Sequence, residues 1–349
     1  MNSFKVSYVT TLPKEGNAPR LTISGDVQKT YKVGFYERGV GLVSSGECKT
    51  NQTIICNSRQ WYTNWEIIVV DENESLVFTD RFDVENQVVF IKIDAYALGD
   101  NIAWVPYVEW FRRERNCKVI CSTFYNELFV DTYPEIMFVK PNTSIENVYA
   151  QYYVGASSDE NKVYSSVNSK EVNLQMVASS ILGLPFEELR PKLHHSFEKT
   201  SRIFAQKYVT LSEFGSGENK SWKAQDGWQQ VVDYLNQLGF MVVVISKEPT
   251  NLKNVIDRTG DYPLSMRMYD IYHSEFHLGI SSGLSWLAWA MGKHVLMISD
   301  VTPRWHEFQT DVTRLCSNDL NSVDYEIEGF TEMEEVVKKI GELVLSRYL

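Results

Sequence analysis

The sequence lacks the features that would attach the chain to a membrane or mark it for export. No apolar run approaches the roughly 18 residues that a membrane-spanning helix needs. Met1–Lys5 is not followed by the apolar segment of a signal peptide. We therefore expect a cytoplasmic protein that makes no use of a membrane.

Metal-binding and nucleotide-binding signatures are also scarce. The five cysteines (48, 56, 117, 121 and 316) have no zinc-site spacing, which is typical of reduced thiols in a cytosolic protein. No D-x-D occurs, and the six histidines show no metal spacing. The strand expected over Val88–Ile93 is not followed by G-x-G-x-x-G, and no P-loop motif is present. The residues thus predict a protein that needs neither a metal ion nor a redox cofactor.

A basic surplus is missing as well. The chain has 34 basic and 45 acidic residues, a formal charge of −11. This balance argues against a chain-wide electrostatic grip on nucleic acid or on an anionic membrane. A local basic stripe around Arg112, Arg113, Arg115 and Lys118 remains compatible with it.

What is present predicts an α/β protein in three parts. Residues 1–86 contain short β-branched and aromatic segments separated by Gly, Asn, Asp and Ser, which indicates a small all-β module. Residues 87–200 and 201–349 alternate apolar strands with helical segments, which is typical of two Rossmann-like, doubly wound domains. Among the expected helices are Asn126–Thr132 and Asn251–Arg258.

The most informative stretch is Gly279–Gly292. Apolar strands are expected over 276–280 and 294–298, and between them Ser281-Ser282-Gly283 begins a short apolar helix. A small-residue turn at a helix N-terminus offers backbone N–H groups to an anion. The pattern therefore predicts a phosphate-binding turn, although many turns of this kind bind nothing.

Two further residues lie where a parallel sheet places its ligands, beyond the carboxyl ends of strands. Asp100 starts a helix after Val88–Ile93, where it could serve chemistry or only cap the helix. Lys220 ends a glycine-bearing loop before another helix, where it could meet a phosphate or remain a solvated lysine.

Two motifs resemble those of a known family. Ala97–Tyr107 and Ile280–Ala290, the second of them rich in tryptophan, are similar to segments of the bacterial autotransporter heptosyltransferases, relatives of the lipopolysaccharide heptosyltransferases. The resemblance extends over nearly the whole chain. It implies a GT-B fold and a nucleotide-diphosphate sugar donor held mainly by the C-terminal half.

The resemblance also implies roles for individual residues. Asp100 matches the family's general base, and Lys220 matches the lysine beside the donor diphosphate. Ser281, Ser282, Gly283 and Leu284 match the phosphate-binding turn. With an ordinary pKa of about 3.9, an aspartate is a weak base, so leaving-group stabilisation should supply much of the rate. Glu248, after the strand near 242–246, is a candidate for holding the donor ribose.

The chain departs from the family in two places. The family carries a Cys-rich iron-binding segment after the second motif, whereas Asp300–Asn321 has only Cys316. This supports the expectation of no metal, and it leaves an oligomer possible but not implied. Asp94–Tyr96 also differs from the family's loop, so the sugar and the acceptor stay open.

Three functions are compatible with these observations. The leading hypothesis is a glycosyltransferase acting on acceptor hydroxyls, with protein Ser/Thr as the acceptor. The second is a phage enzyme that glycosylates hydroxymethylated bases of DNA, which would work in the host cytoplasm. The third is a non-catalytic module that binds a nucleotide sugar without turnover.

Overall fold

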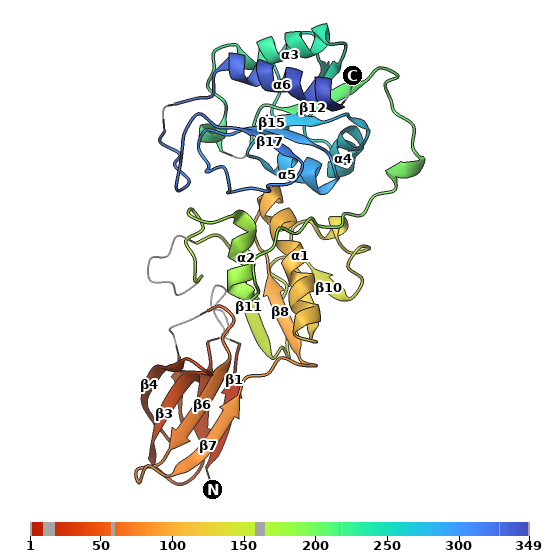
Figure 1. Ribbon diagram of the computed structural model, residues 1–349. Coiled ribbons are helices and arrows are strands. Elements are labelled where there is room, and N and C mark those ends of the chain that lie inside the picture. Colours follow the sequence, from red (N-terminus) through yellow and green to blue (C-terminus); the bar gives the residue numbers. More distant parts are fainter. Residues whose placement is uncertain are drawn as a thin grey trace. The chain divides into compact units, whose positions relative to one another are not determined.

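A computed structural model describes residues 2–9, 18–56, 60–157, 165–215, 217–327 and 329–347 (Figure 1). The chain forms two compact units. The first comprises residues 1–95, 104–169 and 175–187, and the second comprises 96–103, 170–174 and 188–349. The first six residues of helix α1 (Leu98–Glu114) therefore belong to the second unit. The predicted division at residues 86 and 200 stays a prediction.

The beginning of the first unit is built from antiparallel strands. A three-stranded sheet has the order β1-β2-β5 and a four-stranded sheet the order β4-β3-β6-β7. In the four-stranded sheet, side chains alternate between a buried and a more exposed face. Trp65, Ile67 and Val69 of β6 are fully buried, whereas the residues between them are not. The strands are β1 Ser3–Ser7, β2 Arg20–Ser24, β3 Thr30–Glu37, β4 Gly41–Lys49, β5 Gln52–Ile55, β6 Trp65–Val70 and β7 Leu76–Arg81.

Aromatic contacts join these strands to the rest of the first unit. The ring of Phe82 lies 4.7 Å from that of Tyr8 and 5.4 Å from that of Tyr149. Tyr8 also forms a parallel bridge with Ala150. The β-rich beginning therefore packs within one compact unit together with the parallel sheet that follows it.

That parallel sheet has four strands in the order β10-β9-β8-β11. Its central strands β8 and β9 are almost continuously apolar, as expected for a sheet that is covered on both faces. Helix α2 (Leu174–Leu182) follows, with its last eight residues in this unit. The strands are β8 Val88–Lys92, β9 Lys118–Ser122, β10 Ile136–Val139 and β11 Ala150–Tyr153.

The second unit contains a six-stranded, fully parallel sheet. Its order is β14-β13-β12-β15-β16-β17, so the chain leaves β12 in one direction, returns, and continues from β15 in the other. The reversal places β12 directly beside β15. The strands are β12 Tyr208–Ser212, β13 Met241–Val244, β14 Ile256–Asp257, β15 His277–Ile280, β16 Val295–Ile298 and β17 Val312–Leu315.

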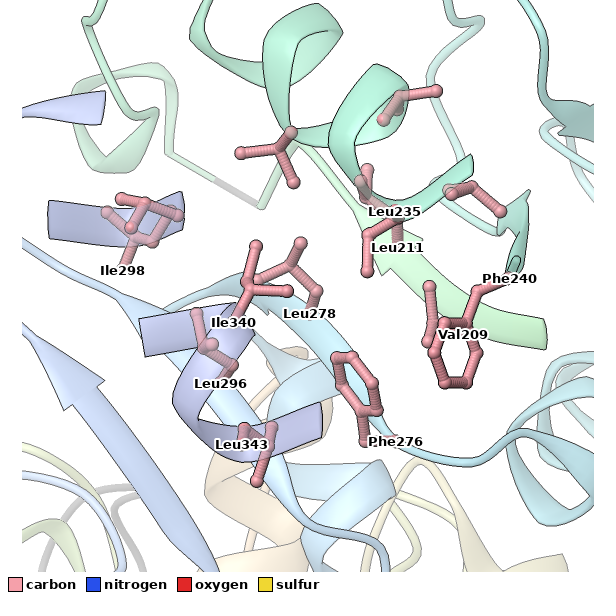
Figure 2. Close-up of a cluster of buried hydrophobic side chains, with 14 of the residues drawn as sticks. Val209, Leu211, Leu235, Phe240, Phe276, Leu278, Leu296, Ile298, Ile340 and Leu343 are labelled. Atoms are coloured by element: carbon pink, nitrogen blue, oxygen red, sulfur yellow. The ribbon is translucent and has the colours of Figure 1, made fainter. Parts of the chain in front are cut away.

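Two helices cover one face of this sheet, and a hydrophobic core lies between the helices and the sheet. Helices α3 (Gly227–Gln237) and α6 (Met333–Arg347) lie next to each other in Figure 1. Their apolar side chains meet those of β12, β13, β15 and β16 in the cluster shown in Figure 2. The unit also contains α4 (Leu264–His273) and α5 (Gly283–Ala290).

Several sequence-based boundaries need correction. Asn251–Arg258 forms no helix but contains β14, a two-residue edge strand. Within Asn126–Thr132 only a single 3₁₀ turn forms, over Asn126–Leu128. Strands β2, β4 and β17 were not predicted. Two more 3₁₀ turns cover Phe197–Lys199 and Glu218–Lys220.

No helix within the described part of the chain is both long enough and apolar enough to cross a membrane. The cytoplasmic location itself stays a prediction.

Candidate active site

The candidate site lies at the point where the six-stranded sheet changes direction. In sheets of this type, ligands bind beyond the carboxyl ends of the two strands that flank the reversal. Here those strands are β12 and β15, which pair through Thr210–Ser212. The loop after β12 leads to Lys220, and the turn after β15 is Ser281–Gly283. Both predicted donor-binding segments therefore start from adjacent strands.

The turn after β15 presents the start of helix α5. Ser282 is the N-cap residue, with extended backbone angles (φ −145°, ψ 167°), and its carbonyl accepts from the amide of Trp286 at 3.2 Å. The amides of the first helical turn, including that of Leu284, have no acceptor within the helix. The Ser282 Oγ is buried and has no hydrogen-bond partner among the described residues. This turn thus offers several donors to one anionic group.

Two glycines bring the start of α1 against this turn. A Cβ built on Gly283 would lie 2.8 Å from Leu98 Cβ and 3.2 Å from the Gly99 amide nitrogen. A Cβ on Gly99 would lie 3.0 Å from Trp286 Cδ1. A methyl group at Gly283 would therefore force the two helix starts apart, and one at Gly99 would require the Trp286 ring to shift by a few tenths of an ångström.

We expect Gly283→Ala to destabilise the second unit by about 1–3 kcal/mol, the usual cost of forcing a methyl group into a packed contact. Chemical denaturation followed by circular dichroism measures this. Gly217→Ala is the matched control, because its Cβ would meet no atom closer than 3.4 Å. Equal midpoints for the two variants would contradict the close packing of the helix starts.

Asp100 lies in the first turn of α1, on the same side of the unit as the turn of α5. Its carboxyl is half-buried, and withdrawal from water raises its pKa to about 6, while the positive charge of Lys220 acts in the opposite direction. A pKa near neutrality makes Asp100 a better base at physiological pH than an exposed aspartate. The ordinary pKa of about 3.9 assumed from the sequence is therefore too low.

Lys220 ends the 3₁₀ turn Glu218–Lys220, and its amide donates to the Gly217 carbonyl at 3.1 Å. Its Nζ lies 5.9 Å from the centre of the Tyr325 ring. Because its charge acts on Asp100, the ammonium group belongs to the same electrostatic environment as that carboxyl. The structure thus brings Asp100, Lys220 and the α5 turn together in one unit.

The other predicted residues differ in their surroundings. Glu248 lies on an exposed bend after β13, the strand next to β12. Ser281 is buried, and its hydroxyl donates to Glu307 Oε1, so that proton is not available to a ligand. These roles for Glu248 and Ser281 stay predictions.

Sequence reasoning missed the groups beneath the turn. Glu307 is 1% exposed and pairs with Arg314 of β17, whose side chain is 7% exposed. Burial favours the neutral acid, but Arg314 and the other polar neighbours overcome it and hold the Glu307 pKa well below its usual range. No periodicity or motif near Glu307 points to this role, because the pair forms only when the sheet is assembled.

The turn also matches G-x-S-x-G, the pattern of a hydrolase nucleophile elbow, through Gly279, Ser281 and Gly283. A nucleophilic serine needs a basic partner that accepts its proton. The partner of Ser281 is instead a carboxylate already paired with Arg314. The geometry therefore does not support hydrolase chemistry at this serine.

Comparison with known proteins identifies the relatives of this chain. It is 30% identical to the autotransporter heptosyltransferase Aah of Escherichia coli over 276 residues, which are 75% of this chain and 70% of Aah. The chain belongs to the autotransporter heptosyltransferase family. This confirms the resemblance inferred from the two motifs. No family model matches the chain.

Two more proteins are similar to this chain, one in its structure and one in its sequence. A crystal structure of the dodecameric, iron-containing heptosyltransferase TibC with ADP-D-β-D-heptose is similar, with a TM-score of 0.83, 20% identity, and coverage of 98% of this chain and 96% of TibC. The likeness shows an α/β glycosyltransferase fold of the GT-B type. A Burkholderia thailandensis relative, BimC, is described as inactive and is 28% identical over 281 residues, 77% of this chain and 66% of BimC.

The comparison overturns one prediction. The sequence predicted no metal cofactor, but TibC is described as iron-containing, so metal independence was the wrong expectation for a member of this family. Within the described ranges of the chain, no three or more His, Cys, Asp and Glu side chains form a group that could hold a metal ion. The described side chains of this chain thus do not fit a bound metal ion.

Proposed function

We propose that this protein transfers a sugar from a nucleotide-diphosphate sugar to a Ser or Thr hydroxyl of a protein. The observation that carries the proposal is the shared environment of Asp100, Lys220 and the start of α5 at the reversal of the sheet. A carboxyl, an ammonium group and a set of free amides are the groups that this transfer needs.

Each group has a defined task in the reaction. Asp100 accepts the proton of the acceptor hydroxyl, and the oxygen of that hydroxyl attacks the anomeric carbon of the donor sugar. The bond between that carbon and the diphosphate oxygen breaks, and the nucleoside diphosphate leaves with the electron pair. Lys220, the α5 amides and the Ser282 hydroxyl stabilise the charge that develops on the diphosphate. Glu248 holds the ribose at the neighbouring strand end.

The relatives support a choice of donor and acceptor. TibC is described in complex with ADP-D-β-D-heptose, and Aah is named an autotransporter heptosyltransferase. We therefore take ADP-heptose as the first donor to test and the passenger of an autotransporter as the first acceptor. None of the reported relatives points to phage DNA as an acceptor.

Three domain assignments and one statement about assembly accompany this proposal. We assign residues 1–86 to a β module that packs within the first compact unit, 87–200 to the acceptor-side domain and 201–349 to the donor domain. The β-rich start supports the first of these, and the Lys220 loop and α5 turn support the last. An oligomer is proposed because TibC is dodecameric.

The test is a transfer assay with purified protein. ADP-heptose, ADP-glucose and UDP-glucose are each incubated with a purified passenger, and intact mass is measured together with release of the nucleoside diphosphate. We expect added mass on the passenger with at least one donor. Donor binding without added mass or release would instead favour the non-catalytic module, and the inactive relative BimC makes this measurement decisive.

The raised pKa of Asp100 predicts the pH dependence of the reaction. The base must be ionised, so kcat/KM should rise with pH through a midpoint near 6 and level off above it. An exposed aspartate would place this limb near 4. Initial rates between pH 4 and 8 at low donor concentration measure it. A midpoint near 4 would contradict the buried environment of Asp100.

A further inference from the structure

A network of buried polar side chains lies directly beneath the turn of α5. Its centre is Glu307, whose carboxylate accepts hydrogen bonds from Ser281 Oγ, from Thr302 Oγ1 at 3.1 Å and from Arg314 Nη1. Arg314 Nη2 also donates to the Thr302 carbonyl at 3.0 Å. Ser299 reaches the same Thr302 hydroxyl at 2.8 Å. Ser281 is the member of this network that belongs to the turn.

The backbone at Glu307 is fixed from two other directions. Asn173 Nδ2 donates to the Glu307 carbonyl at 2.7 Å and to the Trp305 carbonyl at 2.8 Å. Gln309 Nε2 donates to the Glu307 carbonyl at 2.8 Å. The carboxylate is therefore presented to Ser281 from a segment that is itself held in place.

The connection to the turn runs through one hydroxyl. Ser281 is 5% exposed, and its only proton points to Glu307. It immediately precedes the N-cap Ser282, so fixing its side chain also fixes the direction in which the α5 amides point. A buried carboxylate that is balanced by an arginine is a rigid anchor, since the departure of either partner would leave the other charge buried and unpaired.

We propose that Glu307 is a positioning residue that acts through Ser281, holding the α5 turn in the geometry that receives the donor diphosphate. The inference rests on the proposed function, because it assigns a diphosphate to this turn. Arg314 and Thr302 keep the Glu307 carboxylate oriented, and Ser281 transmits its position to the turn.

Four variants test the proposal. Glu307→Gln keeps the shape, but its amide oxygen will face the guanidinium of Arg314 and its NH₂ group will face Ser281. The Ser281 hydroxyl then loses the charged acceptor of its proton and is left with a weaker hydrogen bond of reversed direction. Ser281→Ala removes the link and leaves the buried pair intact. The third variant combines both changes. Asp270→Asn is the control. Asp270 of α4 is also a buried carboxylate (2% exposed) paired with an arginine, Arg258 at 2.7 Å, but it is not part of the Glu307 network.

Two measurements are made on each variant. Hydrogen exchange of peptides covering 281–286 reports the turn, and steady-state kinetics with ADP-heptose reports the reaction. We expect Glu307→Gln and Ser281→Ala each to speed exchange at the turn and to lower kcat/KM about tenfold to hundredfold, as misplacement of a binding group does. The double variant should be no worse than the more impaired of the two single variants, because both changes act on the same connection.

Other outcomes would overturn the proposal. These are unchanged exchange at the turn in Ser281→Ala, multiplying effects in the double variant, or an equal effect of Asp270→Asn on the turn. If Glu307→Gln does not fold, Ser281→Ala alone decides. The wild-type protein could also transfer no sugar while the Glu307→Gln and Ser281→Ala variants show the expected faster exchange at the turn. In that case the positioning role stands and the proposed function falls.

Discussion

Replacing Asp100 by asparagine is expected to lower kcat about 10²–10⁴-fold, the range that a positioned general base contributes. The substitution preserves the shape of the side chain in the first turn of α1 and removes its ability to accept a proton. Donor binding should persist, because the amides of α5 and Lys220 are unchanged. Measurement of kcat by product release and of ADP binding by calorimetry separates the two effects.

Glu109→Gln is the matched control for this change. Glu109 is a carboxylate of the same helix, and it pairs with Arg112 at 2.7 Å, away from the first turn. Activity of this variant should stay close to that of the wild type. Full activity of Asp100→Asn, or the same loss in Glu109→Gln, would remove Asp100 from the reaction.

Lys220→Met should lower kcat about 10²–10³-fold, the usual effect of removing one group that stabilises a developing anion. A change in the pH dependence of the reaction would distinguish this variant from one that has only lost affinity for the donor. The charge of Lys220 lowers the Asp100 pKa, so its removal should raise that pKa further. The acidic limb of the pH–rate profile should therefore move to higher pH.

Lys223→Met provides the comparison, since Lys223 is an exposed lysine three residues farther along the chain. It should change neither kcat nor the midpoint of the acidic limb. If Lys220→Met loses activity but keeps the wild-type midpoint, the ammonium group acts on the donor without sharing the environment of Asp100.

Local patterns were enough to predict much of the fold. The β-rich character of residues 1–86 was predicted, because segments such as Trp65–Val70, which forms β6, are rich in β-branched and aromatic residues. Strand β4 was missed because Gly41–Lys49 contains two glycines and several polar residues, and its conformation depends on pairing with β3. The helix expected over Asn251–Arg258 was wrong, because Ile256–Asp257 is taken up as an edge strand of the parallel sheet.

The positions of the candidate site residues could be predicted where a residue directly follows a strand. Asp100, Lys220 and the Ser281–Gly283 turn all follow strands, so their positions could be inferred from the order of elements. The Asp100 pKa could not, since it depends on how much water the folded chain excludes. Glu307 was missed for a related reason, because its partners come from β17, from the loop after β16 and from the turn after β15.

The expectation of no metal failed for a different reason. It rested on the spacing of cysteines and histidines in the sequence, and spacing describes only sites that are formed by residues close together in the chain. The family's iron-binding segment was judged in the same way, by the single cysteine of Asp300–Asn321, yet the relative TibC is described as iron-containing.

The contact between Gly99 and Gly283 has a consequence for how these proteins can vary. The two glycines are far apart in the sequence, yet a methyl group at Gly283 would clash with Leu98 and one at Gly99 would press on the Trp286 ring. A substitution at one position must be accompanied by a smaller neighbour in the other motif, for instance at Leu98 or Trp286. Homologous sequences should therefore change at these positions in pairs, and a library randomising both motifs together should yield folded variants that single-site libraries do not contain.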